Sequence, residues 1–366
     1  MKKVLISSQS EKQGSAKQVL ILTSKTGGGH ESLAQAIKEG LEKEFQIEIF
    51  DGLPTLAAKI YGFVHLYLPT FFNLAYRLAD NKPAAKILHF FSFLLTYPSL
   101  RKINFEDFDL ILSVQPFLTE EIAWLNPKKF IVFIADPVSI SQVWLCPKAD
   151  LTFVATEEGK KLCLKKGLPK RKIVVSGFPV RQQFLKKLPK KEKSKFTILV
   201  GGSGYGVRET KEIIKNLKNK NIQIIAVCGR SKSLQKSLPQ RKNIKIFGFV
   251  KNMAELMTGC HLIIGKAGPN LLFESIALGI PFLATGYPPE QEKGNIELIK
   301  KYQIGFVEEN PQKAAELIKE LAKNPKKLEK LKPNIQKLAK VHKMAPKIIA
   351  SQIAYLLENS IAAKRR

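Results

Sequence analysis

Short runs of β-branched and aliphatic residues alternate along this chain with longer stretches in which apolar residues recur at helical spacing. Runs of this length, bounded by turn residues and separated by helices, are typical of buried parallel strands in βαβ units. A helix is expected over 31–43, directly after the first run and its turn. In the first half of the chain the predicted strands occupy 19–23, 46–50, 110–114, 130–135, 151–155 and 173–175.

The alternation is interrupted at 185–195, LKKLPKKEKSK, which is rich in Lys, contains Pro189 and lacks apolar periodicity. Such a segment is typical of a solvated linker. The pattern then resumes, with a helix expected over 208–218, and from Pro311 onward the chain is basic and helical without a predicted strand. The strands predicted in this half are 196–200, 222–227, 244–247, 262–265 and 281–284.

Two such halves predict an α/β protein of two doubly wound, Rossmann-like domains that face a cleft. The length of 366 residues also suits two domains rather than one. We expect an N-terminal domain over 1–184, a linker over 185–195, a C-terminal domain over 196–345 and a C-terminal helix over 346–366. This last helix could pack back on the N-terminal domain.

Residues 57–100 do not fit a βαβ pattern, because they form an unusually aromatic stretch. Pro69 and Pro83 divide it into helical pieces of about 10–15 residues, each shorter than a membrane span of about 20 residues. It is either a surface that enters a bilayer interface or holds an acyl acceptor, or an inserted helical pair that packs into the core. The basic residues that flank the aromatic ones slightly favour the interface: Arg77, Lys82, Lys86, Arg101 and Lys102.

The charge balance adds a preference for an anionic partner. Sixty Lys and Arg residues against 31 Asp and Glu residues leave a net charge of +29. Such an excess suits nucleic acid, an acidic membrane surface or a phosphorylated small molecule, although a general bias toward Lys would give the same number. The four cysteines are scattered without a metal-binding spacing, which indicates a reducing compartment. The first apolar run is too short for a signal peptide, and no stretch is long enough to span a membrane.

The first glycine-rich turn, Thr26–His30, follows the first predicted strand and begins the first helix. Its glycines, Gly28 and Gly29 among them, allow a ligand to approach the backbone, and a helix N-terminus offers unpaired N–H groups. The dinucleotide pattern GxGxxG fails here, because Ser32 stands at its last position. His30 is expected to point into the cleft as a general base, or else to bond only to its neighbours at the helix start.

The equivalent turn of the second half, Gly201–Gly206, could bind phosphate through its backbone N–H groups and the Ser203 hydroxyl. It is not a P-loop, because no Gly-Lys-Ser/Thr sequence follows.

The segment 265–275, GKAGPNLLFES, predicts a helix that begins near Pro269 and runs to about Leu278. Gly268 allows close approach, and Lys266 together with the helix start could stabilise a leaving diphosphate. Glu274 is either a ligand of two ribose hydroxyls or a solvated helix residue. The following loop, 285–295, brings carboxylate and amide groups that suit the hydroxyls of a sugar.

These turns, with KAGPNLLFES and PPEQEKGN following in this order, resemble glycosyltransferase family 28 of the GT-B type. The resemblance covers about 19–310, including the GFPVR segment at 177–181. Within this family the chain is most similar to monogalactosyldiacylglycerol synthase and the processive diacylglycerol glucosyltransferases, and more distantly to MurG. The resemblance implies an N-terminal acceptor-binding domain and a C-terminal domain that binds a UDP-sugar.

Carried over to this sequence, the family's donor site comprises a phosphate-binding turn, a base-binding residue, a diphosphate-binding helix start, a ribose ligand and a pair that holds the transferred sugar. In that order these are Gly202, Ser203 and Gly204; Phe249; Gly268 and Pro269; Glu274; and Gln291 with Glu292. His30 is the implied base beside the acceptor, next to Gly28 and Gly29, and Asp136 is a second candidate.

The chain departs from its lipid-modifying relatives near Asp136. Those relatives usually have Thr-Asp and then a histidine before a tryptophan, whereas this chain has Ala135-Asp136 and then Ser141-Gln142 before Trp144. The acceptor class therefore stays open at this stage.

The resemblance implies an inverting transfer of a hexose from a UDP-sugar to a lipid such as diacylglycerol. The expected location is the cytoplasm, peripheral on the inner face of the cell membrane, with an anionic membrane surface as partner. No cofactor and no obligatory metal are expected, because no Asp-x-Asp metal-binding motif accompanies the donor turns. The alternatives are a MurG-like N-acetylglucosaminyltransferase, a UDP-sugar epimerase and a non-catalytic nucleic-acid-binding protein. Nucleic acid ranks low, because the aromatic residues gather in 57–100 whereas Lys is spread over the linker and the C-terminal helices.

Overall fold

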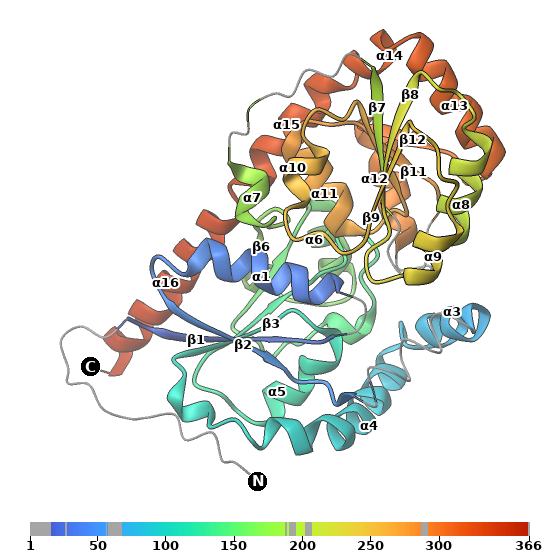
Figure 1. Cartoon of the computed structure of the whole chain (residues 1–366). Coiled ribbons are helices and arrows are strands. Elements are labelled where there is room, and N and C mark those ends of the chain that lie inside the picture. The colour runs from blue at the N-terminus through green and yellow to red at the C-terminus, as the bar shows by residue number, and fades with distance from the viewer. Residues whose placement is uncertain are drawn as a thin grey trace, which may run out of the picture.

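The computed structural model describes residues 16–25, 28–55, 57, 68–186, 189, 195–201, 207–286 and 292–364. Two parallel sheets, each of six strands, lie one in each half of the chain and are flanked by helices (Figure 1). The expected α/β architecture of two doubly wound units is confirmed. Gly202, Ser203, Gly204 and Gln291 lie outside the described residues, as does most of the expected linker.

The first sheet has the strand order β2-β1-β3-β4-β5-β6. Its strands are β1 (Gln18–Thr23), β2 (Gln46–Asp51), β3 (Leu110–Ser113), β4 (Phe130–Phe133), β5 (Leu151–Val154) and β6 (Ile173–Val175). The four inner strands are almost wholly buried between helix layers, and for this reason they appear in the sequence as continuous apolar runs, whereas the edge strand β2 is partly exposed. The helices of this half are α1 (Gly29–Leu41), α3 (Pro69–Leu78), α4 (Lys82–Leu100), α5 (Glu120–Trp124), α6 (Glu157–Lys165) and α7 (Gln182–Leu185).

The second sheet has the order β12-β11-β10-β7-β8-β9. Its strands are β7 (Phe196–Gly201), β8 (Ile222–Val227), β9 (Ile244–Phe247), β10 (Leu262–Gly265), β11 (Phe282–Ala284) and β12 (Gly305–Val307). The helices that flank it are α8 (Val207–Asn216), α9 (Lys232–Ser237), α10 (Met253–Met257), α11 (Pro269–Leu278), α12 (Lys293–Tyr302), α13 (Pro311–Lys323), α14 (Lys326–Glu329) and α15 (Lys332–Lys343). The long helix α16 (Ala345–Lys364) ends the described chain.

Every predicted strand is present within a few residues of its expected bounds, but β12 was not predicted. This strand is only three residues long and begins with Gly305. A Cβ atom at Gly305 would lie 1.9 Å from the carbonyl oxygen of Phe282 in the neighbouring strand, so the position requires glycine. A short strand that begins with glycine carries no β-branched signal.

The aromatic segment forms helices, but one of them is longer than expected. Helix α4 has 19 residues. Pro83 lies in its first turn, where no N–H donor is needed, and Pro98 lies in its last turn, where it removes one helical hydrogen bond without ending the helix. Pro69 likewise begins α3. Among the described residues, no helix combines the length and apolar character that crossing a membrane would need.

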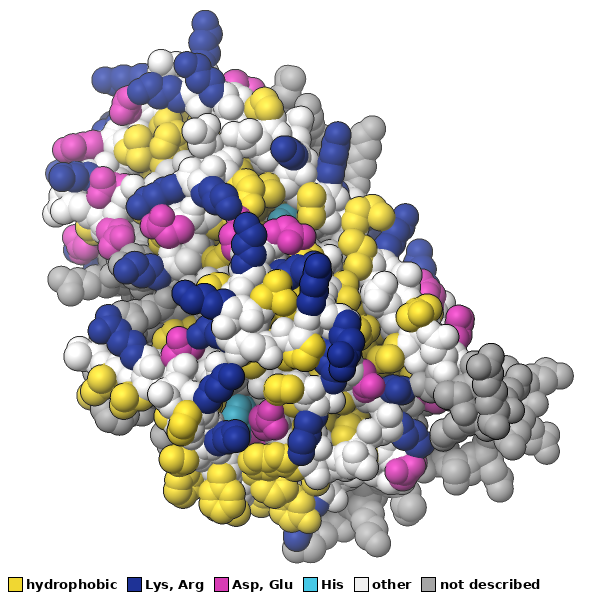
Figure 2. All heavy atoms as spheres, turned by 180° about the vertical axis from the view of Figure 1, so that it is seen from behind, with side chains coloured by type: hydrophobic (Ala, Val, Ile, Leu, Met, Phe, Trp, Pro, Cys, Tyr) yellow, Lys and Arg dark blue, Asp and Glu magenta, His cyan; other side chains and the backbone are white. Residues whose placement is uncertain are grey.

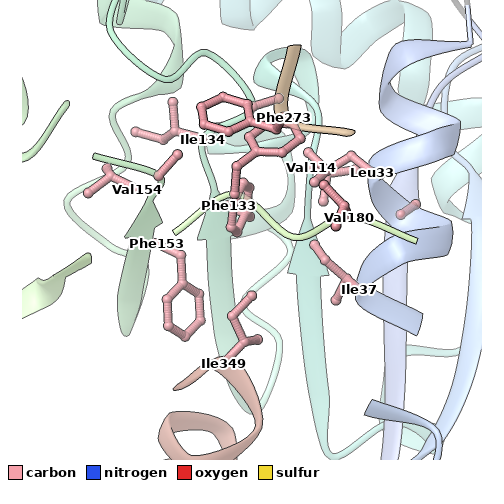
Figure 3. Close-up of a cluster of buried hydrophobic side chains, with 14 of the residues drawn as sticks. Leu33, Ile37, Val114, Phe133, Ile134, Phe153, Val154, Val180, Phe273 and Ile349 are labelled. Carbon is pink, nitrogen blue, oxygen red and sulfur yellow. The ribbon is translucent and has the colours of Figure 1, made fainter. Parts of the chain in front are cut away.

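The two halves share part of one hydrophobic core. Phe178, in the segment that leaves the first sheet, stacks on Phe273 of α11 with ring centroids 4.6 Å apart and planes at 9°. Figure 3 shows Phe273 among side chains of the first half such as Phe133 and Leu33, together with Ile349 of α16. Helix α16 lies against α1, where a Cβ atom at Gly40 would be 2.6 Å from Pro346 Cβ. The C-terminal helix thus returns to the first half of the molecule (Figure 1).

Candidate functional site

Each sheet has one point where the chain reverses its direction of strand addition. In the first sheet this point lies between β1 and β3, and in the second between β7 and β10. Ligands of open parallel sheets bind beyond the carboxyl ends of the strands at such points, because the connections diverge there and leave backbone groups unpaired. The turns that carry His30, Lys266 and Gly268 follow β1 and β10, at these two points.

The first turn reaches α1 through a left-handed residue. Gly28 is the N-cap of α1 with φ 86° and ψ −11°, a conformation that L-residues with side chains rarely adopt. No side chain caps this helix end, so its first N–H groups are available to a ligand. Gly28 therefore has the positive φ that the glycine-rich turn predicted.

His30 is fixed in one tautomer. Its Nδ1 lies 2.7 Å from the carbonyl oxygen of Val114, the residue that follows β3, so Nδ1 donates its proton and Nε2 keeps a lone pair. Burial lowers the pKa of His30 to about 4, and the hydrogen bond to Val114 opposes this only in part. The imidazole is therefore neutral at physiological pH and able to accept a proton at Nε2. It bonds across the first sheet's reversal point rather than to neighbours within its own helix.

Asp136 lies in the same region and is linked to His30 through Trp144. The indole N–H of Trp144 donates to Asp136 Oδ2 at 2.7 Å, and the Trp144 ring lies 6.2 Å from the His30 ring between centroids. Burial raises the pKa of Asp136 to about 7; the Trp144 hydrogen bond lowers it and the charge of Glu292 raises it. Since Glu292 belongs to the second half, the two halves bring these carboxylates near each other.

In the second half, Lys266 and Glu292 form a partly buried ion pair. Lys266 Nζ is 2.8 Å from Glu292 Oε1, and Glu292 is only 6% exposed. The other oxygen, Oε2, is buried without a hydrogen-bond partner among the described residues. A buried carboxylate oxygen without a partner is costly, which makes Glu292 Oε2 a candidate atom for binding a ligand. Asn295 holds this arrangement together, since its Nδ2 donates to the Ala267 carbonyl at 2.7 Å.

Helix α11 begins at the expected residues. Gly268 is its N-cap and Pro269 occupies the first turn, so the start of the helix has free backbone N–H groups and a favourable field for an anion. A Cβ atom at Gly268 would lie 3.3 Å from Lys266 Cε, which leaves little space for a side chain there.

The starts of α1 and α11 face each other across the interface between the halves. Asn270 Nδ2 donates to the carbonyl oxygen of Gly29 at 3.2 Å. The acceptor-side and donor-side turns of the sequence analysis are therefore adjacent. They could hold an acceptor hydroxyl at His30 and a diphosphate at α11 within one site.

One interpretation of the sequence was that Glu274 is a solvated helix residue, and this is wrong. It is 5% exposed, and its Oε1 accepts hydrogen bonds from Arg181 Nη2 at 2.7 Å and Arg181 Nε at 3.2 Å. Its Oε2 makes no hydrogen bond among the described residues. Phe249, by contrast, is 64% exposed on the loop after β9, with the Arg230 guanidinium 5.6 Å from its ring centroid. An exposed ring of this kind can stack on a planar base.

The chain matches two families of known proteins, one in each half. Residues 30–180 match the monogalactosyldiacylglycerol (MGDG) synthase family, and residues 180–349 match the glycosyltransferase family 28 C-terminal domain. The chain is a glycosyltransferase that carries the family 28 domain in its C-terminal half. The resemblance predicted from the TGGGH turn and the EQEKGN loop is thereby confirmed, and so is the assignment as a UDP-sugar hexosyltransferase.

Curated relatives agree with this assignment, and solved structures share the fold. Monogalactosyldiacylglycerol synthase 1 of Arabidopsis thaliana is 28% identical over 365 residues, covering 88% of this chain and 68% of its own. A probable monogalactosyldiacylglycerol synthase 2 of Oryza sativa subsp. japonica is 27% identical over 83% of this chain and 73% of its own. MurG of Acinetobacter baumannii superposes with a TM-score of 0.63 at 15% identity, covering 93% of this chain and 99% of that one. Anabaena HepE, solved with UDP and glucose, gives 0.55 at 15% identity over 93% of this chain and 99% of that one, so the GT-B fold is shared.

The glycosyltransferase does contain one Asp-x-Asp triplet, Asp107-Phe108-Asp109, away from the donor turns. Asp109 accepts from the backbone N–H of Gln18 at 2.9 Å and from Lys17 Nζ at 3.2 Å, both at the beginning of β1. It therefore lies at the edge of the sheet opposite the carboxyl ends. Within the described residues, no group of three His, Cys, Asp or Glu side chains could hold a metal ion.

Three residues of the site were not among the sequence candidates: Arg181, Trp144 and Ser139. Arg181 is the last residue of the GFPVR segment, which entered only as part of the family resemblance. Trp144 entered only because the relatives have a histidine before this tryptophan and the chain does not. No local signal marks Ser139, whose hydroxyl accepts from the Gly294 N–H at 3.0 Å across the two halves.

Proposed function

We propose that this glycosyltransferase transfers a hexose from a UDP-sugar to the free hydroxyl of a diacylglycerol-like lipid at a membrane surface. The observation that carries the proposal is the hydrogen bond between Asn270 and Gly29, which joins the start of α11 to the start of α1. This contact holds the start of α11, where the leaving diphosphate would bind, next to the neutral imidazole of His30. Glycosyl transfer needs these two functions side by side.

The donor would lie with its diphosphate at the N-terminus of α11, where Gly268 keeps the backbone accessible. Lys266 adds a positive charge that stabilises the leaving UDP. Glu292 Oε2, buried and unpartnered among the described residues, would accept from a hydroxyl of the transferred sugar. Phe249 would stack on the uracil, with Gly202, Ser203 and Gly204 at phosphate, Glu274 at the ribose and Gln291 at the sugar.

In the chemical step His30 Nε2 takes the proton of the acceptor hydroxyl. The oxygen attacks the anomeric carbon from the face opposite the diphosphate, the bond from that carbon to the diphosphate oxygen breaks, and UDP leaves with the electron pair. An α-linked donor therefore gives a β-linked product. Asp136 is a second candidate base, favoured by its pKa of about 7, which is close to the working pH.

Helix α4 supports a lipid acceptor, because polar side chains lie on its buried face and large apolar ones on its exposed face. Its buried face includes His89 and Thr96, and His89 Nδ1 lies 3.0 Å from Glu121 Oε1 in the interior. Its outward face is apolar: Phe90 is 55% exposed, Phe91 58% and Leu95 60%, with Ile87, Leu88 and Leu94 beside them. A helix that buries polar residues and exposes aromatic ones suits a non-aqueous surface.

Basic residues border this apolar surface. Lys82 and Lys86 lie exposed on the first two turns of α4, and Arg101 and Lys102 follow its end. Figure 2 shows hydrophobic side chains gathered at the lower left of the molecule, with Lys and Arg side chains around them. An apolar patch with a cationic rim fits the anionic inner face of a cell membrane. We propose that the glycosyltransferase works there as a peripheral protein.

The test is UDP release from a panel of UDP-sugars, with and without anionic vesicles that contain diacylglycerol, combined with analysis of the lipid product. Release that requires one UDP-sugar and diacylglycerol, with β-linked glycolipid formed, is the expected result. UDP binding with release only on a lipid-linked N-acetylmuramyl precursor would assign a MurG-like activity instead. Absence of UDP binding would refute the donor site.

A further inference from the structure

The segment 136–142 is hydrogen-bonded to the α3–α4 helices at two points. Tyr76 of α3 donates from its hydroxyl to the carbonyl oxygen of Ser139 at 2.6 Å. The backbone N–H of Gln142 donates to Asp80 Oδ1, between α3 and α4, at 3.0 Å. The segment that begins with the candidate base Asp136 is therefore fixed to the helices that carry the apolar surface.

The same segment contacts the start of α12 in the second half. The Gly294 N–H donates to Ser139 Oγ at 3.0 Å. A Cβ atom at Gly294 would lie 2.6 Å from Ser139 Oγ and 2.7 Å from Val138 Cγ2, so any side chain at 294 would force the halves apart. Gly294 is two residues from Glu292, the N-cap of α12 and the proposed sugar ligand.

Ser139 thus uses two different atoms to join two elements that are more than 200 residues apart in sequence: its carbonyl oxygen binds Tyr76 and its hydroxyl binds Gly294. We propose that Tyr76 and Ser139 are positioning residues through which α3, on the lipid-facing side, sets the start of α12 and hence the affinity for the sugar donor. The inference rests on the proposed function in treating α12 as the sugar-binding end.

The physical consequence is reciprocal coupling. Tyr76 lies on α3, which also exposes Leu74 and Leu78, so contact of this helix with lipid bears directly on the Ser139 carbonyl. If lipid contact favours the arrangement in which Ser139 meets Gly294, then vesicles must tighten donor binding and donor must tighten vesicle binding by the same factor. Neither Tyr76 nor Ser139 needs to touch the donor.

The test compares Tyr76→Phe, Ser139→Ala and the double variant with Tyr355→Phe and Ser237→Ala as matched controls. Tyr355 is 65% exposed on α16, away from the apolar surface of α4, and the Ser237 hydroxyl bonds within its own helix. Two quantities are measured: the dissociation constant of the UDP-sugar with and without anionic vesicles, and amide hydrogen exchange over 292–296.

For wild type and both controls we expect vesicles to tighten donor binding. In Tyr76→Phe and Ser139→Ala this gain should be lost, with donor binding on vesicles about three- to tenfold weaker, since each variant removes one hydrogen bond. Exchange at 292–296 should be faster in both variants, vesicle binding should be unchanged, and the double variant should be no worse than the more affected single one.

Additive effects in the double variant, or exchange at 292–296 that changes only in Ser139→Ala, would overturn the link. A failure of the proposed function would look different, because the wild type would then bind donor without forming glycolipid. The exchange measurement needs no substrate and would still test the link in that case.

Discussion

Arg181 and Glu274 form an ion pair that joins the end of the first half to α11 in the second. Arg181 Nη2 lies 2.7 Å from Glu274 Oε1, and both side chains are largely shielded from solvent. Burial raises the pKa of Glu274 above its usual value, and the charge and hydrogen bonds of Arg181 offset only part of this rise. Arg181 thus stabilises the ionised form of a buried carboxylate at the proposed ribose site.

Removing Arg181 alone should be strongly destabilising. In Arg181→Met the buried Glu274 loses its counter-charge, and we expect a loss of about 3 kcal/mol in the free energy of unfolding at pH 7. The loss should shrink as the pH falls, because protonated Glu274 no longer needs a partner. Urea denaturation at pH 7 and pH 5 measures this. The double variant Arg181→Met/Glu274→Gln should recover most of the stability, and equal losses in single and double variants would contradict the argument.

His30→Ala should slow transfer strongly while leaving UDP binding intact. A positioned general base accounts for about 10²- to 10⁴-fold in rate, so kcat should fall by a factor within this range. Isothermal titration with UDP provides the control, since His30 lies at α1 and the proposed diphosphate site at α11. If the variant keeps more than a tenth of the wild-type rate, the role of base passes to Asp136.

The pH dependence of kcat/KM distinguishes the two candidate bases. A base acts when deprotonated, so His30, with a pKa of about 4 in the free enzyme, predicts a rise near pH 4 and a flat profile from pH 5.5 to 8. Asp136 would instead give a rise through about pH 7. We expect the flat profile. A midpoint near 7 that disappears in Asp136→Asn would assign the base to Asp136.

His342 should make the fold sensitive to mild acid. Its Nδ1 accepts from the Phe178 N–H at 2.9 Å, its ring packs edge-on against Phe273, and burial lowers its pKa to about 4. In the unfolded chain the pKa of His342 is near 6.5, so as the pH falls the unfolded state binds a proton before the folded state does. The free energy of unfolding therefore falls between pH 6.5 and 4. The loss is on the order of 3 kcal/mol.

The matched variant is His342→Asn, whose Oδ1 can still accept from Phe178 but does not titrate. Its melting temperature should be lower than wild type at pH 7 but should decline less between pH 6.5 and 4.5. An equal slope in the two proteins would show that other groups carry the acid sensitivity.

The outward face of α4 should decide membrane binding. Phe90→Ser together with Phe91→Ser removes two exposed aromatic side chains, and at about 1.5–3 kcal/mol for each buried ring the affinity for anionic vesicles should fall at least about 100-fold. Val341→Ser with Met344→Ser changes two exposed apolar residues at the end of α15 and is the control. Vesicle cosedimentation measures the effect, and equal binding of both double variants would refute a lipid-facing α4.

Local sequence patterns predicted every strand except β12, the glycine turn that precedes α1, and the family. Apolar runs such as 19–23 and 262–265 had to become buried strands because no other element buries a short run on both faces. The start of α11 was predictable to the residue, since Gly268 and Pro269 act locally on the backbone. Local rules sufficed wherever the signal lay within one element.

Contacts between distant segments could not be predicted from local patterns. In the folded protein Glu274 pairs with Arg181, His30 bonds to the carbonyl of Val114 rather than to a neighbour in its own helix, and the apolar face of α4 lies outward. Periodicity shows that a helix has two faces, but the partner that is available to each face depends on residues far away in the chain. For α4 that partner was Glu121, which holds the polar face inside and leaves Phe90 and Phe91 exposed.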